Sequence, residues 1–361
     1  MRRTDLYRAL LGAHGRIGRG LFRDGRALPP VQLFFEATAR CDQACRFCFY
    51  RGELQGPEET AAAELPAEAI LGIVSALPSA RLVSFSGGEP LLRRDMLELL
   101  GRVGADRGVS LETNGGRIDA DTARGLASLA ARALVGPGLL GVDISLHGRP
   151  QTHDWLVRGR AGAFTRAAAG LEALLEARRA AGQRFPLVTV KIVLTATNLE
   201  DLPWLLAWAR QRGVDHLAIK LLDPGRTALS LQGGQSPLRG TGRRLDPGMD
   251  GARLRELLAE ALEPRRTGPE VFMIPLGASI DDAVAHYQGR LDPRSRDCLN
   301  PWSRLSVLPS GEYYLCKIFG AGRAAEMSPL QAWNSEPFRA FRRGLLERGL
   351  PADCVGCCYL E

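Results

Sequence analysis

The sequence has no apolar run approaching the roughly 18 residues that a bilayer-spanning helix needs. Hydrophobic residues make up 45% and charged residues 24% of the 361 residues, as in ordinary globular proteins. The basic N-terminus also lacks a continuous apolar core and a small-residue cleavage site, so no secretory signal is expected. We predict a cytoplasmic protein whose residues 1–30 form a basic helical extension packed outside the main domain. A helix lying on a membrane surface is the alternative.

Lysine is almost absent. Three of the 47 basic residues are lysine (Lys191, Lys220 and Lys317), and the arginines are scattered among alanine, glycine and leucine. The formal net charge is +7, but no dense basic run is interleaved with aromatic residues. The charge therefore does not indicate a nucleic-acid partner.

Cysteine is absent from the long stretch between residues 48 and 298. The eight cysteines form an early and a late group: Cys41, Cys45, Cys48, then Cys298, Cys316, Cys354, Cys357 and Cys358. Disulfide frameworks usually belong to short secreted chains. Clustered cysteines in a long chain without a signal instead indicate metal sites in a reducing compartment.

Apolar, β-branched runs alternate with helical stretches from residue 31 onward. The predicted strands are 31–38, 81–86, 109–113, 140–146, 187–195 and 216–222, and the helices lie near 66–77, 92–104, 119–131, 163–181 and 200–211. This alternation predicts an α/β fold with a parallel sheet and right-handed crossovers. Six units are too few for a full (β/α)8 barrel, so an open, partial (β/α)6 barrel is expected over 31–225.

The alternation stops at Asp223-Pro224-Gly225. Residues 226–250 are rich in Gly, Arg, Pro and Ser, which predicts a loop or lid, and a connector follows to residue 290. The Cys-rich segment 291–361 contains a predicted hairpin around Pro309-Ser310-Gly311 and is expected to form a small C-terminal domain.

Unusual short sequences follow each of the first five strands. They are the cysteine loop, then SGGEP (86–90), TNGG (113–116), SLHG (145–148) and TATN (195–198). A single Gly-rich turn would be an ordinary connection between a strand and a helix. The carboxyl ends of parallel strands share one face of a barrel, so five such turns, one of them with three cysteines, predict a shared site.

The early cysteines have the spacing C-x3-C-x2-C. Zinc normally takes four ligands, and His147 or His153 would have to complete the set. Three thiolates suit a [4Fe–4S] cluster that leaves one iron open to a small chelating ligand.

These motifs together resemble the radical SAM superfamily over roughly residues 31–225. The likeness is carried by Cys41, Cys45, Cys48, the aromatic Phe47 and the segment Gly87-Gly88-Glu89-Pro90. It implies that the open iron binds the amino and carboxylate groups of S-adenosylmethionine, and that Gly87, Gly88 and Glu89 bind its methionine ammonium. A 5′-deoxyadenosyl radical would then remove hydrogen from a substrate.

Three further residues take their expected roles from the same resemblance. Ser145 stands where the family places a polar contact to the cofactor, and Arg158 where relatives carry a carboxylate-binding arginine. Asn114 contacts the cofactor or only stabilises its turn. The alternatives for Ser145 and Arg158 are a strand-end turn and a solvated surface residue.

The late cysteines resemble the SPASM/twitch group, which adds auxiliary clusters after the partial barrel. The likeness implies one auxiliary [4Fe–4S] cluster held by Cys298, Cys316, Cys354 and Cys357, with Cys358 as a spare; a zinc clip is the alternative. Because the sequence stops at Glu361, the shorter twitch version is favoured. Its spacing is like that of twitch-type dehydrogenases of aminoglycoside biosynthesis.

We therefore predict a radical SAM oxidoreductase that completes a net oxidation in natural-product biosynthesis, reduced by a flavodoxin or ferredoxin. Lys220, Asp223 and His147 are the candidate proton acceptors. One alternative is a maturase that cross-links or epimerises a ribosomal peptide. Another is a non-catalytic iron–sulfur or zinc protein, against which SGGEP argues. A GTP cyclase is less favoured because its Gly-Gly tail is missing.

Overall fold

The computed structural model describes residues 3–48, 54, 56, 64–159, 161–222, 249–316, 319–351, 354 and 357. Asp223, Cys358 and nearly all of the expected lid lie outside the described residues. No helix in the described part of the chain is long and apolar enough to cross a membrane.

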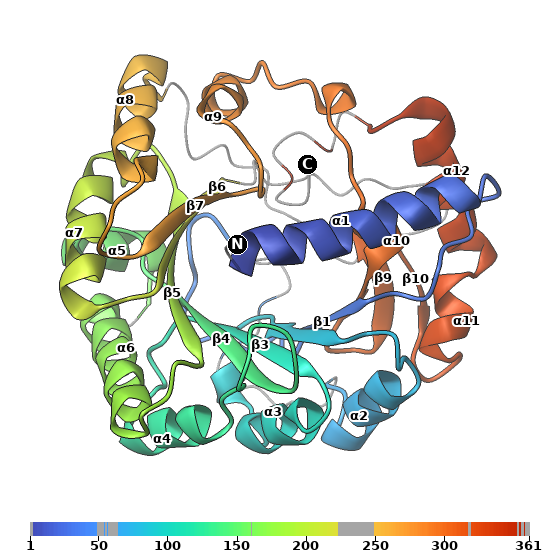
Figure 1. Ribbon diagram of the computed structural model, residues 1–361, viewed down its shortest axis with the longest axis horizontal. Helices are drawn as coiled ribbons and strands as arrows, with labels where there is room; N and C mark the ends of the chain where they lie inside the picture. Colours follow the sequence, from blue (N-terminus) through green and yellow to red (C-terminus); the bar gives the residue numbers. More distant parts are fainter. Residues whose placement is uncertain are drawn as a thin grey trace.

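A single curved sheet forms the centre of the molecule (Figure 1). Its six central strands agree with the sequence prediction: β1 (Gln32–Glu36), β2 (Leu82–Ser86), β3 (Gly108–Thr113), β4 (Gly138–Ser145), β5 (Leu187–Leu194) and β6 (His216–Leu221). Each strand pairs in parallel with its neighbour in sequence, as strand–helix alternation requires. The predicted α/β partial barrel is confirmed.

The sheet extends beyond these six strands at both edges. Strand β7 (Glu270–Ile274) pairs in parallel with β6. On the other side β8 (Arg304–Val307) pairs in parallel with β1, and β9 (Glu312–Cys316) and β10 (Phe319–Arg323) follow antiparallel. The Cys-rich C-terminal hairpin therefore continues the barrel sheet next to the strand that leads into the first cysteines.

Helices cover the outer surface of the barrel (Figure 1). They are α2 (Ala67–Ser75), α3 (Met96–Gly104), α4 (Ala120–Ser128), α5 (Pro150–Val157), α6 (Ala163–Ala180), α7 (Leu202–Arg212) and α8 (Gly251–Leu262), with 3-10 turns η1 (Pro90–Leu92) and η2 (Leu199–Asp201). Their apolar stripes bury the outward side chains of the strands, such as the stacked pair Phe35 and Phe85. The inward side chains of the strands do not face this apolar layer, so they can be polar.

The C-terminal region adds α9 (Ile280–Tyr287), η3 (Pro293–Ser295), α10 (Asn300–Ser303), α11 (Pro329–Trp333) and α12 (Glu336–Arg348). A capping box between Ser279 and Asp282 begins α9. Arg342 of α12 is buried and donates to the carbonyls of Pro301 (2.7 Å) and Trp333 (2.8 Å). This guanidinium therefore fixes α12 to α10 and α11.

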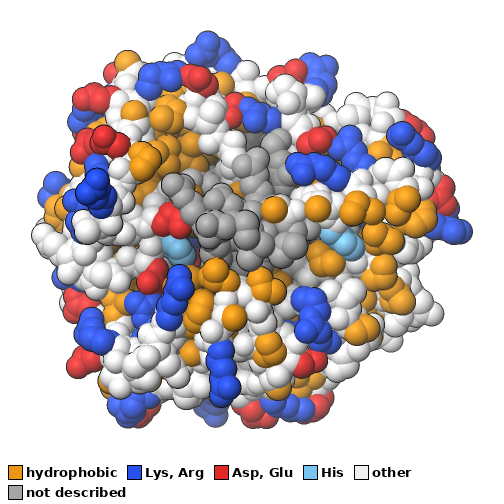
Figure 2. Space-filling view, in the orientation of Figure 1, with side chains coloured by type: hydrophobic (Ala, Val, Ile, Leu, Met, Phe, Trp, Pro, Cys, Tyr) orange, Lys and Arg blue, Asp and Glu red, His pale blue; other side chains and the backbone are white. Residues whose placement is uncertain are grey.

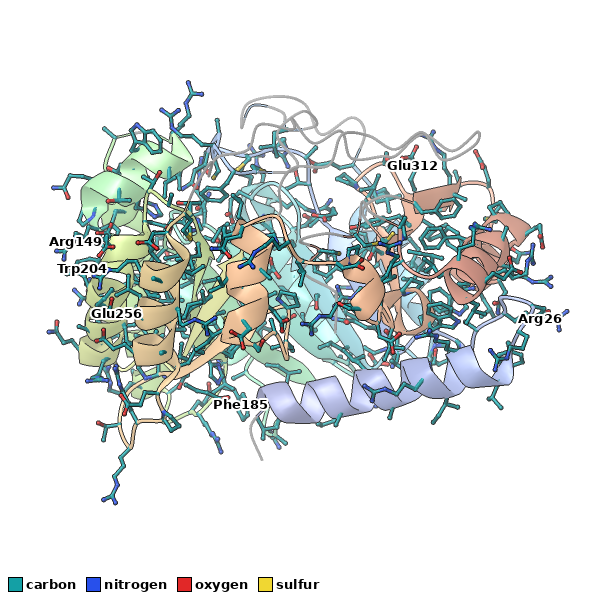
Figure 3. All side chains as sticks on the ribbon, turned by 90° about the horizontal axis from the view of Figure 1, so that it is seen from above. Arg26, Arg149, Phe185, Trp204, Glu256 and Glu312 are labelled. Carbon is teal, nitrogen blue, oxygen red and sulfur yellow. The ribbon has the colours of Figure 1, made fainter. Side chains whose placement is uncertain are left out.

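Helix α1 (Arg3–Leu21) lies across one end of the barrel. Figure 3 places it at the same end as Phe185, which lies two residues before the start of β5, so α1 covers the amino ends of the strands. Its His14 contacts the carbonyl of Pro29 (3.1 Å), and its Arg19 pairs with Asp297. On this face basic and acidic side chains are interspersed around the rim (Figure 2). The opposite, carboxyl end of the barrel is left for the motifs.

Candidate active site

The first cysteines lie on the loop that follows β1. Cys41, Cys45 and Cys48 are half-buried, and the amide of Cys48 donates to the carbonyl of Cys45 (3.2 Å). Burial, opposed by a backbone hydrogen bond at Gln43, raises the pKa of Cys41 to about 12. Burial and the neighbouring thiols raise the pKa of Cys45 well above its usual value. Thiolates are therefore stable here only beside a cationic centre, which is the condition that a bound iron–sulfur cluster satisfies.

The three thiols of the loop fit a [4Fe–4S] cluster that leaves one iron open. Within the described residues, no three Cys, His, Asp or Glu side chains are grouped as ligands of one metal ion. A [4Fe–4S] cluster does not need such a grouping, since each cysteine binds a different iron. The loop therefore offers three separate thiol ligands.

The SGGEP turn is packed directly on the chain that leads into Cys41. The amide of Gly88 donates to the carbonyl of Thr38 (2.7 Å), and the amide of Glu89 donates to the carbonyl of Arg40 (2.8 Å). A Cβ atom on Gly88 would lie 2.1 Å from the Arg40 oxygen, and one on Gly87, whose φ is +125°, would lie 2.6 Å from the Thr38 oxygen. Only glycine allows this approach, so both glycines position the cysteine loop.

Glu89 ties this turn to the end of β3. Its buried carboxylate accepts hydrogen bonds from the Thr113 hydroxyl (2.7 Å) and from the amides of Asn114 (2.6 Å) and Leu91 (3.1 Å). Burial raises its pKa to about 7, although these hydrogen bonds favour the charged form. The carboxylate is thus occupied by three protein donors, which suits a positioning residue better than the expected direct contact with a ligand.

Asn114 joins the third strand-end turn to the cysteine loop. Its side-chain nitrogen donates to Asp42 (2.8 Å), and its side-chain oxygen accepts from the amide of Gly116 (2.9 Å). Asp42 also pairs with Arg117 (3.1 Å). Of the two expected roles of Asn114, stabilising the turn is the one that the geometry displays. Sequence reasoning missed Asp42, because its partners are some 70 residues away.

Charged side chains on β3, β5 and β6 line the inside of the barrel near these turns. Lys191 donates to Glu112 at 2.5 Å, and Ser145 lies opposite Lys191 in the register of β4 and β5. Burial opposes ionisation of Glu112, but the ammonium groups of Lys191 and Lys220 outweigh it and lower its pKa to about 2. Glu112 and Lys191 were not singled out from the sequence. The sequence signal that could have identified them is a charged residue within an otherwise apolar strand.

His147 lies beside the cysteine loop, with Phe47 packed edge-on against its ring at 4.6 Å. Its Nδ1 accepts a hydrogen bond from the amide of Val193 (3.2 Å). Burial, followed by the nearby His153, lowers the pKa of His147 well below its usual value. The neutral ring therefore carries its proton on Nε2 and can only donate there. This geometry does not support the expected role as a proton acceptor.

Arg158 is exposed directly after α5, in a left-handed conformation with φ of 47°. Lys220 stands at the end of β6, inside the barrel and close enough to act on Glu112. The structure thus gathers the residues from β1 to β6 at one end of the barrel, whereas Arg158 lies on the rim.

The later cysteines form a second, more buried group. Cys298, Cys354 and Cys357 pack together with Leu350, and the amide of Cys357 donates to the carbonyl of Cys354 (3.1 Å). Cys316 ends β9 and is also buried.

Asn300 connects the segment of Cys298 to β9. It lies two residues after Cys298 and donates to the carbonyl of Leu315 (2.7 Å), next to Cys316. Four thiols contributed by three separate segments fit one fully ligated cluster.

Two family models match the chain. The radical SAM superfamily matches residues 35–209, and the SPASM iron–sulfur cluster-binding domain matches residues 298–358. The chain belongs to the radical SAM superfamily. Its C-terminal part is a SPASM domain, so the resemblance on which both groups of cysteines were interpreted is confirmed.

Individual relatives are more distant. A probable GTP 3′,8-cyclase of Methanopyrus kandleri is 32% identical over 205 residues, which are 55% of this chain and 58% of that protein, less than two thirds of its length. A PqqA peptide cyclase of Granulibacter bethesdensis is 24% identical over 91% of this chain and 80% of its own. The structure of Streptococcus suis SuiB bound to its precursor peptide SuiA, 18% identical, matches with a TM-score of 0.63 over 91% of this chain and 70% of that one. This last likeness shows the shared fold.

Proposed function

We propose that the protein is a radical SAM oxidoreductase that removes a hydrogen atom from a natural-product precursor and completes a net oxidation. The observation that carries this proposal is the packing of the cysteine loop on the SGGEP turn, at the carboxyl end of a barrel with a charged interior. A non-catalytic electron carrier would not need two glycines that let the SGGEP backbone approach the cysteine loop so closely. It would not need polar groups inside the barrel either.

Cys41, Cys45 and Cys48 would hold the [4Fe–4S] cluster. When bound, the cluster and S-adenosylmethionine supply a 5′-deoxyadenosyl radical that abstracts a substrate hydrogen. The chain holds the cysteine loop in place by two backbone hydrogen bonds to the SGGEP turn. Glu89 and Asn114 fix that turn and the loop against the end of β3.

The charged interior would bind and orient the substrate. Glu112 is ionised at neutral pH and accepts hydrogen bonds, while Lys191 and Lys220 offer donors on the facing strands. Ser145, opposite Lys191, is the proposed polar contact to the cofactor or substrate. Lys220 is the proposed proton acceptor once its ammonium has lost a proton, and the rim residue Arg158 is the proposed carboxylate ligand.

The four later cysteines would hold an auxiliary [4Fe–4S] cluster that accepts the second electron of the oxidation. Their burial separates this cluster from water. The segment from β8 to β9 places Cys316 on a strand of the same sheet as β1. Both groups of cysteines are therefore attached to strands of one sheet.

A peptide substrate is the second candidate. It is favoured by the PqqA peptide cyclase, which aligns with nearly the whole chain, and by SuiB, which has the same fold and was solved with a peptide. Incubation with candidate precursor peptides and mass spectrometry decides between the two. A loss of two mass units from a peptide would establish a maturase.

The proposed activity is tested with anaerobically reconstituted protein, S-adenosylmethionine and dithionite. Formation of 5′-deoxyadenosine is expected, and Cys41→Ala should abolish it. Iron analysis should give about eight irons per chain, falling to about four in a Cys298→Ala/Cys316→Ala variant. Four irons in both proteins would remove the auxiliary cluster from the proposal.

A further inference from the structure

An exposed tryptophan lies on the surface beside the cysteine loop. Trp155 of α5 is 48% exposed, and the guanidinium of Arg46 lies over its ring at 4.0 Å. The Arg46 side chain also donates to the Trp155 carbonyl (2.9 Å). Exposed tryptophan and arginine are enriched at the centres of protein interfaces, so this pair indicates a binding surface.

This surface is hydrogen-bonded to the cysteine loop. The amides of Ala44 and Arg46 donate to the carbonyls of Val157 (3.0 Å) and Leu156 (2.8 Å). Arg46 directly follows Cys45. A protein bound over Trp155 would therefore be separated from the cysteine loop by a single layer of chain.

Three further arginines lie near the cysteine loop, α5 and the adjoining 113–116 turn. Arg117 pairs with Asp42 of the loop, Arg158 follows α5, and Arg166 lies at the start of α6 beside the 113–116 turn; all three arginines are exposed. Together with Arg46 and Trp155 they define what we call the Trp155 surface.

The carboxylates of this region are already engaged. Asp42 accepts from Asn114 and pairs with an arginine. Asp154 accepts from the amides of Gly162 (3.1 Å) and Phe164 (2.7 Å). Among the described residues named here, four arginines face these two carboxylates, so this set has a net positive charge. A positive surface attracts an acidic partner and accelerates its association.

We infer that the Trp155 surface binds an acidic one-electron carrier protein, of the flavodoxin or ferredoxin class. The inference rests on the proposed function, which requires one electron for each cleavage of S-adenosylmethionine. The carrier gives up that electron and is oxidised by one unit, and the electron enters the chain at the cysteine loop. Electron tunnelling weakens exponentially with distance, and the Trp155 surface is hydrogen-bonded directly to the cysteine loop through the amides of Ala44 and Arg46.

The test measures binding separately from catalysis. A Trp155→Ala/Arg166→Glu variant is compared with Leu330→Ala/Arg265→Glu as a matched control. Leu330 is 47% exposed, and Arg265, like Arg166, is exposed and donates to one backbone carbonyl. Binding of oxidised flavodoxin to the reconstituted proteins is followed by calorimetry. Dithionite-driven formation of 5′-deoxyadenosine is measured in parallel.

We expect the Trp155→Ala/Arg166→Glu variant to bind flavodoxin at least about tenfold more weakly, with the control unchanged. Raising the salt from about 50 to about 300 mM should weaken the wild type more than the variant. Dithionite-driven formation of 5′-deoxyadenosine should be equal in the wild type, the variant and the control. Equal affinities of the wild type and the Trp155→Ala/Arg166→Glu variant would overturn the inference, as would an equal loss in the Leu330→Ala/Arg265→Glu control. If the binding difference appears but dithionite yields no 5′-deoxyadenosine, the proposed function fails and the surface stands.

Discussion

Gly88→Ala tests how the SGGEP turn holds the cysteine loop. The added Cβ would lie 2.1 Å from the carbonyl oxygen of Arg40 and 2.7 Å from its carbon. Restoring an ordinary contact of 3.4 Å would require the two segments to separate by 1.3 Å. That movement would break the two backbone hydrogen bonds from Gly88 to Thr38 and from Glu89 to Arg40. At about 0.5–1.5 kcal/mol each, the expected cost is about 1–3 kcal/mol of unfolding free energy.

Gly72→Ala is the matched control for this substitution. Gly72 lies in α2, where an added Cβ would have no atom within 4 Å. Alanine is the better helix former, so this variant should be more stable by up to about 1 kcal/mol. Thermal unfolding should therefore shift in opposite directions for the two variants.

The functional effect of Gly88→Ala should exceed its effect on stability, because the displaced segment leads directly into Cys41. We expect a lower melting temperature and a loss of iron from the early site, measured after anaerobic reconstitution. Affinity for S-adenosylmethionine should fall with the iron. Wild-type iron content and melting temperature in Gly88→Ala would refute the reasoning that close approach of the two backbones positions this loop.

Three further substitutions probe the other contacts. Glu89→Gln replaces one carboxylate oxygen, a hydrogen-bond acceptor, by an amide nitrogen that faces a buried backbone amide. It should lower the unfolding free energy, measured with denaturant, by about 1–3 kcal/mol. Unchanged stability would show that the hydrogen bonds to Glu89 do not stabilise the fold. Lys191→Met removes the main cation beside Glu112. Because Lys191, together with Lys220, lowers the pKa of Glu112 to about 2, the difference in unfolding free energy between variant and wild type should be largest above pH 4.5 and shrink as the pH falls towards 2. A difference that widens in acid would contradict this. Asn300→Ala frees the carbonyl of Leu315 and should lower auxiliary iron content while the early site stays loaded, as resolved by electron paramagnetic resonance.

The placement of the motifs could be predicted from sequence because it depends on local pattern. Strands alternate with helices, and parallel strands bring their carboxyl ends together, so the cysteine loop, SGGEP and TNGG were expected on one face. The proposed roles of Cys41 and Cys298 rest on spacing and family resemblance.

Contacts between distant strands were beyond the sequence. The pair of Glu112 and Lys191 depends on the register of β3 to β5, and the contact of Asp42 with Asn114 on how the loop folds back. The joining of β8 to the edge of β1 depends on a pairing across some 270 residues. The tautomer of His147 is set by a backbone amide of β5, which no pattern near His147 reveals.

The most direct measurement is 5′-deoxyadenosine production by the anaerobically reconstituted protein with S-adenosylmethionine and dithionite. A Cys41→Ala variant and a Cys316→Ala variant serve as the comparison. We expect production of 5′-deoxyadenosine by the wild type, none by Cys41→Ala, and retained production by Cys316→Ala. Production that is absent in the wild type, or unchanged in Cys41→Ala, would contradict the assignment of the early cysteine loop as the site of radical formation.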